Sequence, residues 1–169
     1  MEKRCKKAQL NLSFGMIFSI ILIVIFLAVA FYAIQKFLEF QNTANIGKFR
    51  NDFQSDVDNL WRGVQGQSEK EYFLPSKIKQ VCFIDYQSGK TGRYSLIYEE
   101  LEHLFYEREN MFFYPAGSAY GLDSTIISHV NITETTSGEN PYCIENIKGK
   151  INVAIKKDFG EALVTIERR

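Results

Sequence analysis

Residues 14–34, FGMIFSIILIVIFLAVAFYAI, decide how the rest of this 169-residue chain is interpreted. They lie within an uncharged run that extends over residues 8–35. As a helix they would span roughly 31 Å, which matches the hydrocarbon core of a bilayer at about 30 Å. A helix that is apolar on every face has no side to turn toward water. The stretch therefore predicts a transmembrane helix, with the lipid bilayer as its first partner.

The residues before this run predict its orientation. Residues 1–8 carry four Lys and Arg side chains against Glu2 alone. Short basic flanks stay in the cytoplasm, so we expect a single-pass protein of the cell membrane with a cytoplasmic N-terminus and an extracytoplasmic C-terminal domain. The alternative is a cleaved secretory signal, for which Ala28-Val29-Ala30 resembles the cleavage site. The apolar region of such a signal is about 7–15 residues, and the uncharged run here is nearly twice as long.

The junction between the basic and apolar residues reads Lys7-Ala8-Gln9-Leu10. It resembles the processing site of archaeal type IV pilin-like proteins, whose precursors carry class III signal peptides. The resemblance covers the N-terminal ~35 residues. It implies that a prepilin-type peptidase cuts after Ala8, that Gln9 becomes the new N-terminus, and that the apolar helix packs against copies of itself or other pilin-like subunits. Ser13 occupies the fifth mature position, where bacterial pilins carry a glutamate.

The predicted organisation has four parts. Residues 1–8 are a basic leader, 9–37 a transmembrane helix, 38–70 an amphipathic helical stalk and 71–169 an α+β head. From residue 36 onward the chain has sixteen Lys and Arg and nineteen Asp and Glu, a net charge of −3. A weakly acidic exterior argues against non-specific nucleic-acid binding, which needs a basic surface.

Hydrophobic spacing beyond the membrane segment predicts the fold class. After a weak helix-forming patch at residues 42–47, apolar residues recur at helical spacing until Val64. A short helix is expected over residues 95–108, and strands over residues 78–86, 111–114, 125–132, 150–156 and 162–167. The prediction is an α+β fold, in which a long N-terminal helix, half membrane-spanning and half amphipathic, packs on a mostly antiparallel β-sheet.

Two of the three cysteines lie in the predicted exterior domain. Cys5 is on the cytoplasmic side, whereas Cys82 and Cys143 face the compartment where disulfides persist. A bond between them would contribute roughly 4 kcal/mol in the chain-entropy model. The alternative is two separately buried thiols, because spacing alone does not show that the two Cα atoms approach each other.

Motifs that would indicate catalysis are incomplete. Ser88-Gly89-Lys90-Thr91 lacks the earlier glycine of a phosphate-binding loop and predicts a turn. His103, with acidic residues one turn before it, is better explained by a solvated helix face than by a metal site. His129 has Asp123 and Ser124 nearby in sequence but no nucleophile motif. We therefore expect no enzymatic activity, no cofactor and no metal.

Three further features are interpreted conservatively. Asn131-Ile132-Thr133 is an N-glycosylation sequon on the predicted outer side, so Asn131 is a candidate glycan site. Residues 111–114 are expected in the core. The lysines near the C-terminus are expected on the solvated face of a hairpin. The alternative is that they form a binding surface for an acidic partner or polysaccharide. They are Lys148, Lys150, Lys156 and Lys157.

Two functional hypotheses follow. The first is a membrane-anchored, pilin-like surface protein that assembles through its apolar N-terminal helix and displays the α+β domain. The second is an unprocessed, signal-anchored extracytoplasmic binding or envelope-accessory domain. The mature N-terminus discriminates between them.

Overall fold

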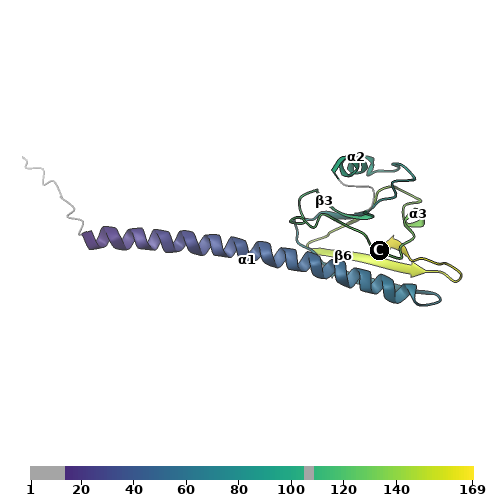
Figure 1. Ribbon diagram of the computed structural model, residues 1–169, viewed down its shortest axis with the longest axis horizontal. Helices are drawn as coiled ribbons and strands as arrows, with labels where there is room; N and C mark the ends of the chain where they lie inside the picture. The colour runs from purple at the N-terminus through teal and green to yellow at the C-terminus, as the bar shows by residue number, and fades with distance from the viewer. Residues whose placement is uncertain (1–13, 105–108) are drawn as a thin grey trace, which may run out of the picture. The chain divides into compact units, whose positions relative to one another are not determined.

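The computed structural model describes residues 14–104 and 109–169. The chain forms two compact units, which meet between Leu38 and Glu39. The first contains the apolar part of helix α1 (Phe14–Trp61), and the second contains the rest of α1 and every other element. Figure 1 shows the elements of the second unit, here called the head.

Within the head, α1 buries one stripe of side chains. Ile46, Phe49, Phe53 and Val57 are 0–3% exposed and recur every three or four residues, which places them on one face of the helix. The patch at residues 42–47, expected to loosen the helix, is helical throughout. Burial of Ile46 explains this difference, because tertiary packing outweighs weak local propensity.

Three antiparallel strands form the first sheet, in the order β1 (Gly66–Phe73), β6 (Lys150–Lys157) and β7 (Thr165–Arg168). β1 pairs with β6 along its whole length, from Gly66 opposite Lys157 to Phe73 opposite Lys150. The expected helical stalk over residues 38–70 is therefore wrong at its end. The helix stops at Trp61, and residues 66–70 belong to β1.

The sequence of β1 explains why spacing alone does not predict this strand. GQSEKEYF is polar at most positions, and only Tyr72 of its eight residues is buried. As an edge strand it pairs on one side only and covers little of the core, so it lacks the alternating apolar pattern of a half-buried strand. Its pairing with the apolar β6 decides its structure.

The second sheet has four strands in the order β4 (Ser124–Thr125), β3 (Met111–Tyr114), β2 (Gln80–Phe83) and β5 (Tyr142–Glu145), and all its ladders are antiparallel. The strand expected over residues 125–132 is wrong. β4 is only two residues long, and residues 132–135 form the helical turn α3 (Ile132–Thr135). Here Asn131 accepts a hydrogen bond from the backbone N–H of Glu134 and so caps the turn.

Both faces of this four-stranded sheet are buried. One face joins the main core beneath α1, where Phe53 lies 5.9 Å from the ring of Phe83. The other face is covered by α2 (Ser95–Leu104), which packs Leu101 against Phe112 and the two cysteines. Figure 1 shows α2 on the side of the head away from β6. Two-sided burial explains the continuous apolar runs in β2 and β3.

The structure confirms the expected α+β class, with a long apolar N-terminal helix and antiparallel sheets, although there are two sheets instead of one. Residues 111–113 are fully buried, as predicted. Of the helix expected over residues 95–108, the last four residues lie outside the described part.

One lysine of the expected C-terminal strip turns inward. Lys157 is 8% exposed, and its Nζ donates to the carbonyl oxygens of Trp61 at 2.6 Å and Gly63 at 2.9 Å. These carbonyls lie at the C-terminal end of α1, where unpaired acceptors and the helix dipole favour a cation. The expectation that Lys157 lies on a solvated face is therefore wrong; instead it links β6 to the end of α1.

Candidate functional site

The apolar part of α1 is the first candidate for function. Among residues 14–104 and 109–169, α1 is the one helix that is long and apolar enough to cross a membrane. Its most apolar eighteen residues have a mean hydropathy of 3.0, and none of them is buried. Large apolar side chains exposed along the whole segment are stable only in a nonpolar environment. This helix is compatible with a single-pass membrane anchor. The predicted processing residues Lys7, Ala8, Gln9 and Leu10 lie outside the described residues.

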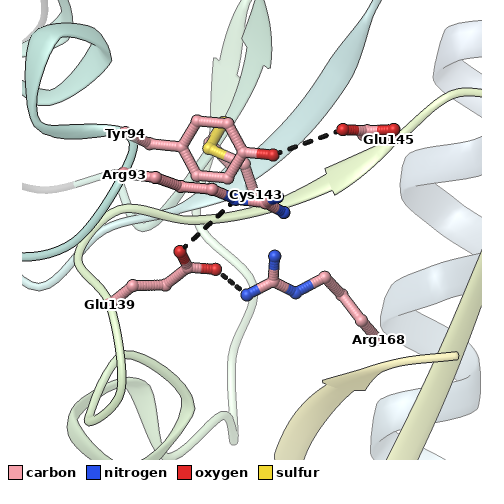
Figure 2. Close-up of a disulfide and its surroundings, with 7 residues drawn as sticks. Arg93, Tyr94, Glu139, Cys143, Glu145 and Arg168 are labelled. Atoms are coloured by element: carbon pink, nitrogen blue, oxygen red, sulfur yellow. Dashed lines mark hydrogen bonds and ion pairs between the residues drawn. A yellow bond between two sulfur atoms is a disulfide. The ribbon is translucent and has the colours of Figure 1, made fainter.

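The cysteines Cys82 and Cys143 meet in the second sheet. Cys82 of β2 lies directly opposite Cys143 of β5, with Cα atoms 4.0 Å apart, and their sulfurs form a disulfide. Both residues are 0% exposed and lie under α2. The structure therefore has a bonded pair in place of two separate thiols. Figure 2 shows this disulfide and the charged side chains around it.

Beside the disulfide, two arginines converge on one carboxylate. The Glu139 side chain, 13% exposed, forms an ion pair with Arg168, and its other oxygen lies 3.7 Å from Arg93 Nε. Figure 2 shows a dashed line from the carboxylate of Glu139 to each of the two guanidinium groups. Burial, and then the positive charge of Arg93, lower the pKa of Arg168 from its ordinary value. Arg168 nevertheless keeps its charge at neutral pH.

Tyrosine rings hold both guanidinium groups in place. Arg93 lies over the ring of Tyr94 at 4.5 Å, and Arg168 lies over the ring of Tyr142 at 4.3 Å. The Tyr142 hydroxyl also accepts a hydrogen bond from the backbone N–H of Arg168 at 2.6 Å. Stacking of this kind fixes the plane of a guanidinium and leaves N–H groups at its edge available for donation.

In front of these side chains is a depression of about 250 Å³, called here the arginine hollow. It combines three positive charges with one carboxylate, one amide and an apolar rim, and it is lined by Arg93, Ile144, Glu145, Ile147, Asn152, Arg168 and Arg169. Glu145 belongs to β5, Asn152 to β6 and Arg168 to β7, so both sheets contribute. Arg93 lies before α2, and Ile147 and Arg169 follow β5 and β7. Sequence reasoning missed the hollow, because its residues are spread over 77 positions of the chain without a motif.

The sequon is part of the structure of the head. Asn131 caps α3 with its side-chain oxygen, and the hydroxyl of Thr133 donates to the carboxylate of Asp85 at 2.9 Å. Asp85 is 5% exposed. Its burial acts to raise the pKa, but hydrogen bonds from Ser88, the Gln87 backbone and Thr133 outweigh burial, so the pKa of Asp85 is lowered. Glycosylation of Asn131 stays a prediction.

The histidines lie apart from the arginine hollow. His129 Nδ1 lies 2.8 Å from Asp58 Oδ1 of α1, and its ring stacks on Trp61 at 3.7 Å. This contact holds the last turns of α1 and differs from the Asp123 and Ser124 relay considered above. His103 is exposed on α2. Among the described residues, no three His, Cys, Asp or Glu side chains gather into a metal-binding group.

Comparison with known proteins adds no relative: no family model, no curated protein and no solved structure matches this chain.

Proposed function

We propose that this chain is a single-pass, membrane-anchored, pilin-like surface protein that assembles through its apolar N-terminal helix and displays the head outside the cell. The observation that carries the proposal is the helix itself. Within the part of the chain that the structure describes, every side chain from Phe14 to Leu38 is exposed, including all the large apolar ones. Such a surface requires lipid, copies of the same helix, or both in succession.

Two further observations support the proposed orientation. The head contains a buried disulfide, which persists in oxidising compartments and is rare in the cytoplasm. The positive charges of residues 1–8 favour retention of the N-terminus on the cytoplasmic side. Both observations support a position of the head outside the cell.

The Lys7-Ala8-Gln9-Leu10 junction supports the pilin-like part of the proposal through its resemblance alone. The alternative function is an unprocessed, signal-anchored binding or envelope-accessory domain. The same helix and the same disulfide serve both, so the difference lies in cleavage after Ala8 and in assembly.

The decisive experiment is mass analysis of the mature N-terminus from the membrane fraction of cells that express the full chain and a prepilin-type peptidase. We expect an N-terminus at Gln9, and Ala8→Leu should abolish cleavage and leave a membrane-bound, unassembled precursor. Ala30→Leu is the matched control, because the same substitution there blocks only secretory-signal cleavage. Assembled protein that still carries Met1 would support the anchored alternative, and a chain that starts at Phe31 would exclude both.

Protease treatment of intact cells tests the orientation independently. We expect the head to be digested from outside and the residues before the helix to be protected. Protection of the head would contradict the proposed topology.

A further inference from the structure

The arginine hollow has more hydrogen-bond donors than its own carboxylates satisfy. Each guanidinium carries five N–H groups, whereas a carboxylate accepts about four hydrogen bonds. Arg93 and Arg168 share Glu139, and the 3.7 Å separation between Arg93 and Glu139 is an ion pair too long for a hydrogen bond. Arg169 pairs with Glu69 at 2.8 Å. The Arg93 side chain is 58% exposed, so its remaining donors face solvent.

The hollow is also arranged in advance of any ligand. Tyr94 and Tyr142 stack against two of the arginines, and Glu139 fixes their separation. The disulfide at Cys143 and the β-ladders anchor the backbone on which these side chains stand. Because the donors are already oriented, a bound oxyanion would order few side chains, and the entropic cost of binding is correspondingly small.

The mixture of groups discriminates between ligand classes. Asn152 offers an amide that both donates and accepts, and Glu145 adds a carboxylate that accepts only. One oxygen of Glu145 already accepts a hydrogen bond from the Tyr94 hydroxyl at 3.4 Å, which leaves its other oxygen to accept one from a ligand hydroxyl. A simple anion such as sulfate has no hydrogen to offer this acceptor. A carboxylated sugar supplies both an oxyanion and hydroxyl donors.

The size and charge of the surroundings limit the ligand further. The depression, about 250 Å³ in volume, is of a size to hold one such residue of a chain. The net charge of −3 from residue 36 onward disfavours nucleic acid, which binds to an extended basic surface. Recognition must therefore come from local contacts with one acidic group at a time.

We propose that the arginine hollow binds a carboxylated sugar residue of an acidic polysaccharide. Arg93 and Arg168 hold the carboxylate, Asn152 and Glu145 hold ring hydroxyls, and Ile147 contacts the ring. This binding site lies wholly within the head, and it holds whether or not the chain is processed and assembled.

The test measures binding of galacturonate and of oligogalacturonate to the purified full chain in detergent by ligand-observed NMR. We expect saturable binding of galacturonate and none of galactose, which has the same ring and no carboxylate. Arg93→Gln should weaken binding roughly tenfold or more, because it removes a charge-assisted hydrogen bond. Arg62→Gln is the matched control, since Arg62 is exposed in the turn after α1, does not line the hollow, and the change in charge is identical.

Glu145→Gln separates a sugar site from a general anion site. We expect this variant to weaken galacturonate binding, because an amide accepts fewer hydrogen bonds, and to leave sulfate binding unchanged or stronger. Equal urea midpoints for each variant and the parent chain show that the fold is intact.

Absence of galacturonate binding by the folded parent chain overturns the proposal. Equal loss in Arg62→Gln overturns it too, because the effect would then be one of net charge. Binding of polyglutamate as strong as that of oligogalacturonate would assign the hollow to acidic peptides and overturn the sugar assignment. None of these outcomes bears on cleavage after Ala8, so the function proposed above is tested separately.

Discussion

Breaking the Cys82–Cys143 disulfide is the most informative perturbation of the head. The bond joins residues separated by 61 positions, and both side chains are 0% exposed. In the chain-entropy model, a cross-link that closes a loop of this length lowers the entropy of the unfolded chain by about 14 cal/mol/K. At 25 °C this loss destabilises the unfolded chain by about 4 kcal/mol. A typical domain has only about 5–15 kcal/mol of total stability. The reduced head is therefore expected to be marginally stable.

Two forms of the perturbation separate the cross-link from packing. Reduction of the parent chain keeps both sulfur atoms in the core and removes only the covalent bond. The double variant Cys82→Ala/Cys143→Ala also removes two buried sulfur atoms, and the resulting small cavities should add about 1–2 kcal/mol. We expect a loss of about 4 kcal/mol on reduction and about 5–6 kcal/mol in the double variant.

The chain provides its own probe for this measurement. Trp61 is the only tryptophan, and in the folded head it stacks on His129 at 3.7 Å. Its fluorescence should change when the head unfolds and the stack is lost. Urea titrations of the full chain in detergent, with and without reductant, give the two midpoints, and thiol titration of the denatured, unreduced protein counts the free cysteines.

Coincident midpoints with and without reductant would refute the reasoning, because a bond that closes a 61-residue loop must change the unfolded state. Detection of free Cys82 and Cys143 in the unreduced protein would refute the disulfide itself. Cys5 is the one thiol that the disulfide leaves free, so its signal also reports whether the leader remains attached.

Three further predictions concern single side chains of the head. Lys157→Met should lower the free energy of unfolding by about 1.5–3 kcal/mol, because it removes two charge-assisted hydrogen bonds to the end of α1. The control Lys156→Met breaks only a surface ion pair and should change this free energy by less than about 1 kcal/mol. Urea midpoints measure both variants. Asn140→Ala should lower the free energy of unfolding by about 2–4 kcal/mol in the same titration. Asn140 is 1% exposed, donates hydrogen bonds to the carbonyls of Asp85 and Gly89, and accepts one from the backbone N–H of Asp85. A loss below about 1 kcal/mol would contradict these hydrogen bonds. Folding lowers the pKa of Asp85, so this carboxylate stabilises the folded head above its ordinary pKa of 3.8, and the stabilisation is lost as the pH falls through the pKa of the folded state. The free energy of unfolding of Asp85→Asn should therefore depend less on pH between pH 5 and 2 than that of the parent chain. Parallel pH profiles for the variant and the parent chain would exclude this contribution.

Periodicity carried most of the correct predictions about the fold. The stripe of α1 in the head, the buried run of β3 and the alternation of β6 all follow from apolar residues at helical or strand spacing. β1 and β4 escaped prediction, because an edge strand and a two-residue strand bury too few side chains to produce a pattern. Ile46 shows the converse, since its burial keeps a weak helix-forming patch helical.

By itself, the order of residues determined that one segment of this protein is too apolar for water and that an α+β domain follows it. Those conclusions depend on local properties, namely transfer free energy and the period at which side chains repeat. Tertiary structure alone decided that Cys82 lies opposite Cys143, that Lys157 turns toward the end of α1, and that Arg93 and Arg168 share one carboxylate. Strand register and the packing of two sheets bring these residues together, and neither is encoded in the spacing of any one segment.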